Sequence, residues 1–169
     1  MKSRMWALVI GAALLIGGGG RALAHCQIPC GIYNDEARFT LMSEHVKTIA
    51  KSMRQIVAIG MSAERNENQL VRWVKNKEAH ADKLSEIVTY YFMTQRIKPV
   101  SKSKKAAYAK YVREVTLLHQ ILVTSMKAKQ STDQKHCTKL RKLIAEFKES
   151  RLPKKAAFPV KAKGSSAKK

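Results

Sequence analysis

The sequence lacks several features that would mark a common class of protein. No stretch shows sustained alternation of apolar and polar residues, which argues against a β-sheet. Beyond residue 24 no apolar run approaches the ~20 residues of a membrane-spanning helix, so stable membrane insertion of the remaining chain is not expected. No aromatic-interleaved basic strand or known nucleic-acid motif is present, which argues against specific nucleic-acid recognition.

Acidic residues are also scarce. The 169 residues include 33 lysines and arginines but only 12 aspartates and glutamates, which gives a formal net charge of +21. A field this positive attracts small anions, nucleic acid and anionic membranes alike. Because the lysines are spread along the chain, the charge alone does not choose among these partners.

The first 24 residues have the three parts of a secretory signal. Lys2 and Arg4 form a basic start, residues 5–16 form an uncharged apolar run, and residues 22–24 (Ala-Leu-Ala) form a cleavage site. We expect a leader-removing peptidase to cut after Ala24, and export to a periplasm, the exterior or an organelle lumen. If the segment is only a processed propeptide, the protein stays in the cytoplasm. The alternative is an uncleaved anchor, but the apolar run is short and ends in four glycines.

Residues 35–152 contain four amphipathic patterns in which apolar residues recur at spacings of three and four, as on one face of a helix. Polar turns at 62–68, 101–105 and 130–134 separate them. The four stripes are Phe39, Met42, Val46, Ile49, Met53 and Ile56; Leu70, Val74, Ala81, Leu84, Val88 and Tyr91, interrupted by Lys77; Tyr108, Tyr111, Val115, Leu118, Leu122 and Met126; and Cys137, Leu140, Ile144 and Phe147.

These patterns predict an all-α fold, an antiparallel up-and-down four-helix bundle over residues 35–152. Asn34 or Asp35 can cap the first helix, Pro99 ends the second, and Ser131 or Thr132 could cap the fourth. Residues 153–169 are predicted to be a disordered basic tail.

Residues 25–34, His-Cys-Gln-Ile-Pro-Cys-Gly-Ile-Tyr-Asn, directly follow the predicted cleavage site. Cleavage would bring a free α-amine, the His25 imidazole and the thiols of Cys26 and Cys30 into one short turn. The amine has a reference pKa of ~7.7–8.0 and is partly deprotonated at neutral pH. Together with the Cys26 sulfur it can chelate a metal through the intervening amide nitrogen. Cys30 would fill a fourth planar position and the His25 ring an axial one, so we predict an N-terminal metal-binding hook.

Displacing the amide proton requires a strongly polarising ion. Nickel(II) and copper(II) accept tetragonal nitrogen and sulfur ligands, whereas zinc prefers a tetrahedron and calcium prefers oxygen. Thiolate and amidate donors stabilise a higher oxidation state, which favours a Ni(III)/Ni(II) couple. A one-electron couple beside a positive surface suits superoxide, a small radical anion that it can oxidise and reduce in turn.

The hook has a simpler alternative. Two cysteines behind a secretion signal usually form a disulfide, and a ring closed by Cys26 and Cys30 is sterically possible. The chain would then be an exported basic protein that carries a metal or binds anions or nucleic acid. Three residues separate the two cysteines, whereas two residues separate the cysteines of zinc knuckles and thioredoxin-like sites.

The pattern His-Cys-x-x-Pro-Cys-Gly-x-Tyr at a mature N-terminus resembles that of the nickel superoxide dismutases. The resemblance extends to about Leu152 and includes the Tyr91-Phe92 pair and Lys98-Pro99. The matching hook positions are His25, Cys26, Pro29, Cys30, Gly31 and Tyr33.

The resemblance implies a homohexamer of four-helix bundles that disproportionates superoxide to dioxygen and hydrogen peroxide. One nickel ion per subunit would be bound by the amine and ring of His25, the amide nitrogen and sulfur of Cys26, and the sulfur of Cys30. It also implies that Tyr33 lies over the open face of the metal and takes part in catalysis with His25, and that Tyr91 lies nearby.

The chain departs from the family around these ligands. Gln27 stands where some members have an aspartate, and Thr40 where some have a glutamate that orients the histidine ring. His80 matches loosely an arginine of the same network. For His45 and His119 we expect no metal role, and we expect Cys137 to be buried rather than a ligand.

Overall fold

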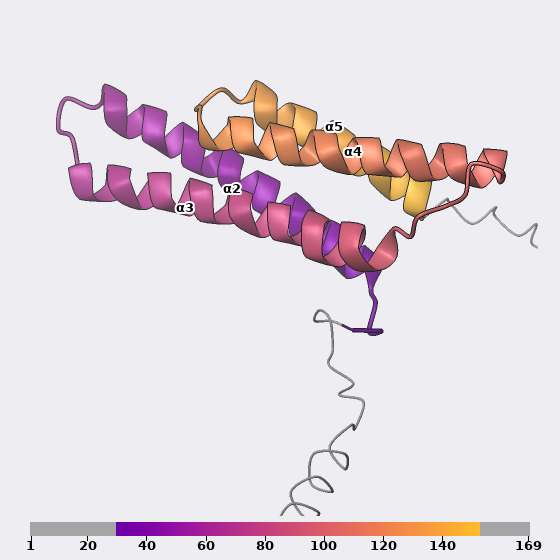
Figure 1. The fold of residues 1–169 in the computed structure, drawn as a ribbon. Helices are drawn as coiled ribbons and strands as arrows, with labels where there is room; N and C mark the ends of the chain where they lie inside the picture. The colour runs from indigo at the N-terminus through magenta and orange to yellow at the C-terminus, as the bar shows by residue number, and fades with distance from the viewer. Residues whose placement is uncertain (1–29, 153–169) are drawn as a thin grey trace, which may run out of the picture. The chain divides into compact units, whose positions relative to one another are not determined.

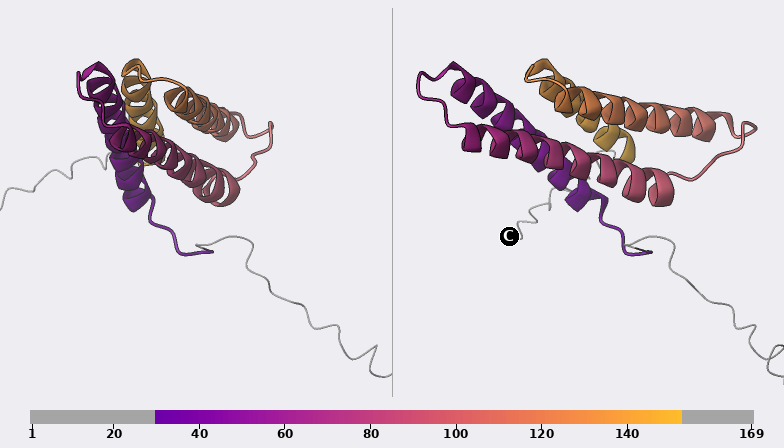
Figure 2. Two further views of the ribbon diagram at one scale, coloured as in Figure 1. Left: turned by 90° about the vertical axis from the view of Figure 1, so that its left-hand side faces the viewer. Right: turned by 60° about the vertical axis from the view of Figure 1, so that its left-hand side comes forward.

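In the computed structural model, residues 30–152 are described, and all their regular structure is helical. The helices are α2 (Asp35–Met61), α3 (Glu67–Glu86), which continues into the π-helix η1 (Ile87–Arg96), α4 (Lys105–Lys129) and α5 (Lys135–Arg151). In Figures 1 and 2, α2 runs antiparallel to α3, and α4 runs antiparallel to α5. The predicted all-α four-helix fold is confirmed in these residues. No described helix combines the length and apolar character needed to cross a bilayer.

Several predicted segments lie outside the described residues. They are the leader 1–24, the first five residues of the hook (25–29) and the tail 153–169. Their assignment remains a prediction from the sequence.

Local hydrogen bonds set where the helices begin. The side chain of Asn34 accepts the Ala37 N–H at 3.0 Å and caps α2, as predicted. The predicted caps of the fourth helix are wrong, because α5 begins at Lys135 after Gln134. The Ser131 hydroxyl instead accepts the N–H of Asp133 at 2.9 Å, and the Asp133 carboxylate accepts the N–H of Lys135 at 2.9 Å. The polar residues of this turn therefore bond within the turn.

Three of the four predicted stripes form the core. The stripe positions are buried from Phe39 to Met53 on α2, from Lys77 to Tyr91 on α3 and η1, and from Cys137 to Phe147 on α5, with exposed residues between them. The stripe predicted on α4 is partly wrong, since Met126 is 48% exposed. The buried face of that helix carries Glu114, Leu117, Leu118, Ile121, Thr124, Ser125 and Ala128. This face includes polar residues that are buried because they have hydrogen-bond or ion-pair partners, so the spacing of apolar residues alone did not predict it.

Lys77, which interrupts the stripe of α3, has a structural role. Its side chain is buried, and its ammonium donates to the carbonyl of Lys129, the last residue of α4, and to that of Ser131 at 3.2 Å. The last carbonyls of a helix have no partner within the helix. Lys77 therefore caps the C-terminal end of α4 from a neighbouring helix.

An aromatic cluster joins three helices at the end of the bundle where α2 begins. Phe39 of α2, Phe92 of η1 and Phe147 of α5 are all buried, with ring centroids 4.8–5.5 Å apart. Aromatic pairs at this separation and tilt are favourable beyond the burial of their area. Tyr91 packs against this cluster, with its ring centroid 4.9 Å from that of Phe92.

Candidate metal centre

The last residues of the predicted hook, 30–34, are described by the structure. Cys30 is an exposed thiol. Gly31 has a φ of +77°, a left-handed conformation that residues with a side chain rarely adopt. The chain therefore turns sharply at Gly31, directly after Cys30. His25 and Cys26, the other predicted ligands, lie outside the described residues.

Two tyrosines meet where this segment enters the bundle. The rings of Tyr33 and Tyr91 have centroids 5.9 Å apart and an interplanar angle of 77°. Tyr33 is 40% exposed, whereas Tyr91 is buried. The structure thus brings these two predicted site residues together, with one phenol accessible and the other forming its support.

The carboxylate of Asp35, the first residue of α2, organises the side chains beneath these rings. Arg96 donates from Nε to Oδ1 at 2.7 Å and from Nη2 to Oδ2 at 3.1 Å, and the Tyr91 hydroxyl donates to Oδ1 at 2.7 Å. Arg151 of α5 donates from Nη2 to Oδ2 at 3.1 Å. We call Asp35, Tyr91, Arg96 and Arg151 the Asp35 cluster. It joins the start of α2 to the ends of η1 and α5.

A second buried acid extends the cluster. Glu114 of α4 is buried and lies 3.7 Å from Nη1 of Arg151, and its other oxygen accepts a hydrogen bond from the Ser150 hydroxyl at 3.1 Å. Arg151 therefore bridges two carboxylates from different helices. Two arginines balance two acids, which permits the burial of so much charge.

The π-helix explains how Tyr91 and Arg96 reach the same carboxylate. On an α-helix, residues five apart point about 140° away from each other. In η1 the hydrogen bonds join residues five apart, as from the N–H of Ile97 to the carbonyl of Phe92 at 2.8 Å. Wider turns of this kind bring residues five apart to one side of the helix. The 3.6-residue period used for the sequence could not reveal this pairing.

The cluster sets the charge states of its members. Burial raises the pKa of the Asp35 carboxyl, but hydrogen bonds from Arg96, Tyr91 and Arg151 outweigh burial and lower that pKa to about 2. Burial and the hydrogen bond to Asp35 both raise the pKa of Tyr91. At neutral pH Asp35 is therefore ionised and Tyr91 is a neutral phenol.

His80 lies elsewhere on the bundle. Its Nδ1 is 3.0 Å from Nδ1 of His45, so the two half-buried rings join α3 to α2. His80 precedes Tyr91 by eleven residues, on the order of 15 Å along the helix at an α-helical rise. Its placement around the metal ligands stays a prediction. His119 is exposed, and Cys137 is buried with its thiol 3.6 Å from the sulfur of Met53.

Sequence reasoning recognised Asp35 only as a possible cap and missed Arg96 and Arg151. The signal that was available is weak: an acid at the first position of the bundle and arginines at the ends of two helices. Nothing in the sequence shows that the three side chains meet, because Arg151 is 116 residues away from Asp35.

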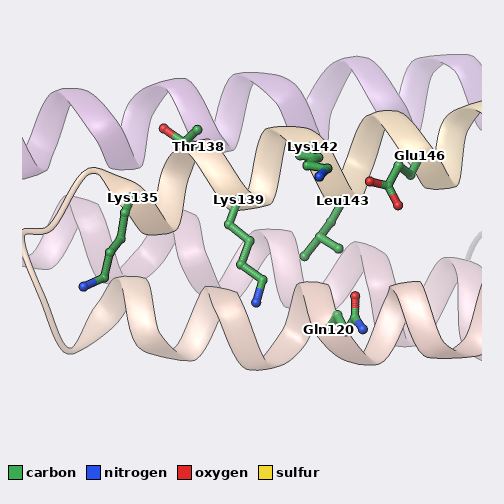
Figure 3. A pocket seen from close by; sticks show the side chains of 7 residues that line it. All are labelled: Gln120, Lys135, Thr138, Lys139, Lys142, Leu143 and Glu146. Atoms are coloured by element: carbon green, nitrogen blue, oxygen red, sulfur yellow. The ribbon is translucent and has the colours of Figure 1, made fainter.

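The other candidate surfaces are less well suited to metal chemistry. Among residues 30–152 no group of three or more histidine, cysteine or acidic side chains could hold a metal ion. A groove of about 580 Å³ lies between α4 and α5 (Figure 3), with Lys135 and Lys139 on the side of α5 that faces α4. Its lining is Gln120, Lys135, Thr138, Lys139, Lys142, Leu143 and Glu146. This lining could attract anions but has no set of metal ligands.

Comparison with known protein families gives one match. The family model described as "Nickel-containing superoxide dismutase" matches residues 20–155, which include the predicted hook and all four helices of the bundle. Neither curated proteins nor solved structures gave a match.

Proposed function

The chain belongs to the nickel-containing superoxide dismutase family, enzymes that act on superoxide, and we propose that its reaction takes place at a nickel ion bound by His25, Cys26 and Cys30. The observation that supports this most directly is the family match, which spans the hook as well as the bundle. The left-handed turn at Gly31 and the supported Tyr33 ring agree with a hook whose last residues join the start of α2.

The donor set suits nickel. An amine, an imidazole, an amide nitrogen and two thiolates are the nitrogen and sulfur ligands that nickel(II) accepts in tetragonal sites. Bound there, the metal would supply the one-electron Ni(III)/Ni(II) couple that the overall reaction needs, in which two superoxide ions and two protons give dioxygen and hydrogen peroxide.

The residues of the chain have separate tasks in this proposal. The terminal amine of His25 becomes a ligand only after the leader is removed, so processing after Ala24 creates the site. The exposed phenol of Tyr33 would order superoxide or water at the site. The ring of Tyr91, whose hydroxyl donates to Asp35, packs edge-on against the ring of Tyr33.

We further propose a homohexamer with one nickel ion per subunit, exported after cleavage of the leader. A chain that begins at His25 has 30 basic and 12 acidic residues, a formal charge of +18. This charge steers a small anion towards the protein, and the attraction weakens as salt screens it.

Serine variants of the two hook cysteines test the ligand set. In Cys26→Ser and Cys30→Ser we expect nickel to fall from one ion per chain to less than about a tenth, with loss of superoxide consumption, because a hydroxyl is a poor ligand for nickel(II). Cys137→Ala is the matched control, since this thiol is buried in the core and should keep both properties. Nickel and activity retained in either hook variant would exclude the proposed ligands.

Native mass spectrometry of the purified protein tests the processing. We expect His25 as the first residue, six chains and six nickel ions. A variant that keeps one residue before His25 should bind nickel weakly, because its amine is displaced from the chelate. Active material that still carries Ala24 would refute the role of the amine. A nickel carrier would bind the metal without turnover, whereas a nucleic-acid-binding protein would lose affinity steeply with salt and ignore chelators.

A further inference from the structure

Arg96 contacts Tyr33, a residue near the end of the hook. The central carbon of its guanidinium lies 4.5 Å from the centre of the Tyr33 ring, within cation–π distance. Tyr33 follows Cys30 by three residues and packs edge-on against Tyr91. The guanidinium and the Tyr91 ring are thus the two described contacts that hold the Tyr33 ring, which is otherwise 40% exposed.

Asp35 fixes the direction of the Arg96 guanidinium. The two hydrogen bonds between them, at 2.7 and 3.1 Å, use both oxygens of the carboxylate and form a planar fork. The carboxylate is itself held by Tyr91 and Arg151. A lysine at position 96 could keep one ion pair, but it could not form the fork or present a flat cation to the ring.

The π-helical turn of η1 and the aromatic core hold this arrangement in place. Arg96 is the last residue of η1. The N–H of Ile97, the next residue, donates to the carbonyl of Phe92, whose ring is fully buried, and this hydrogen bond ends the π-helix. A segment of π-helix is rare and is frequently found at functional sites. Here it lets the phenol of Tyr91 and the guanidinium of Arg96 both donate hydrogen bonds to the carboxylate of Asp35.

We propose that Arg96 is a positioning residue for the nickel site, acting through Tyr33, the hook residue whose ring it contacts. This inference rests on the proposed function. Without the fork and the stacked cation, Tyr33 keeps only its edge contact with Tyr91 and can turn into solvent. A reacting group displaced by ~1 Å can lose about 10²-fold in rate. Because the Tyr91 contact remains, we expect a loss of about tenfold.

Variants of Arg96 with a charge-matched control test the proposal. In the mature nickel-loaded enzyme, Arg96→Gln and Arg96→Lys should keep one nickel ion per chain and lower kcat about tenfold, measured by pulse radiolysis. Lys98→Gln removes a nearby exposed charge without touching the Asp35 cluster, and its kcat should stay within about twofold of wild type. Full activity in Arg96→Gln would overturn the proposal. Recovery in Arg96→Lys would also overturn it, since Arg96 would then act only through its charge.

A double-mutant cycle tests whether the effect passes through Tyr33. Tyr33→Ala should lower kcat, and adding Arg96→Gln should change it by less than about twofold further, because the ring that Arg96 holds is gone. Independent, multiplicative losses would overturn the proposal. Arg96→Lys keeps an ion pair with Asp35, so the cycle can be run with lysine if glutamine impairs folding.

NMR of the Tyr33 ring separates this proposal from the proposed function. In the nickel-free protein labelled at tyrosine, the ring signals of Tyr33 should move towards those of free tyrosine in both Arg96 variants but not in Lys98→Gln, because the ring turns away from Tyr91 into solvent. Unchanged signals would overturn the positioning role, whatever the activity. If the signals do depend on Arg96 but the wild-type protein binds no nickel and consumes no superoxide, the proposed function fails and the contact between Arg96 and Tyr33 stands.

Discussion

Replacing Asp35 with asparagine should destabilise the bundle more than any exposed acid would. The variant keeps the shape of the side chain but removes the charge that two arginines share. Removing one partner of a buried ion pair costs about 3–5 kcal/mol. The side chains of Arg96 and Arg151 are 28% and 16% exposed, so water can partly solvate them after the change. We therefore expect a loss of about 2–3 kcal/mol in the free energy of unfolding at pH 7.

The pKa of Asp35 gives a separate and somewhat lower figure for the contribution of this charge to stability. It falls from 3.8 to about 2 on folding, because the hydrogen bonds from Arg96, Tyr91 and Arg151 outweigh the effect of burial. By linkage this shift corresponds to about 2.4 kcal/mol, which solvent screening reduces to about 1–2 kcal/mol. Since the folded pKa is depressed, this stability is present above about pH 4 and is lost as the pH falls towards 2. The dependence of stability on pH in this window should be weaker in Asp35→Asn.

Urea unfolding of the nickel-free protein, at one fixed protein concentration, measures both effects. Removal of nickel and a constant concentration matter because ligand binding and subunit association add to apparent stability. Asp82→Asn is the matched control: its carboxylate is 58% exposed and pairs with Lys129 at 2.8 Å, so the loss should be below about 0.5 kcal/mol. If Asp35→Asn falls within 0.5 kcal/mol of wild type, or if its stability depends on pH below 4 as in wild type, the reasoning is refuted.

Two further predictions concern the interior of the bundle. Lys77→Met should lower the free energy of unfolding in urea by about 1–3 kcal/mol, because the C-terminal carbonyls of α4 lose a charged donor. Lys75→Met, at an exposed position of α3, should change it little. A stabilised Lys77→Met would show that burying the ammonium costs more free energy than its hydrogen bonds return. Burial first, and nearby positive charge second, lower the pKa of both His45 and His80 below 6.5. The unfolded chain then binds more protons than the folded one, so the free energy of unfolding should fall as the pH drops from about 7 to 5. The fall should be less steep in His45→Gln. A wild-type free energy of unfolding that does not change over this pH range would contradict the prediction.

Much of the fold could be predicted because its signals are local. A helix that buries one face repeats apolar residues every three or four positions, and this identified the core residues of α2, α3 and α5. The apolar spacing did not identify the buried face of α4, where Glu114 and Ser125 are buried. Ser125 is satisfied by the carbonyl of Ala81 and Glu114 by Arg151, and both partners lie on other helices. A polar residue in the core can be predicted only when its partner is known.

The sequence by itself determined the chemistry of the proposed nickel site, because the ligands His25, Cys26 and Cys30 lie within six residues and the peptide that joins them supplies the amide nitrogen. Only the tertiary structure decided what supports Tyr33. The partners of Asp35 are 56, 61 and 116 residues away along the chain, and they meet only after the helices pack and η1 widens its turn. A chelate formed by adjacent residues needs no fold to bring its atoms together, whereas an ion cluster shared by three helices exists only in the packed bundle.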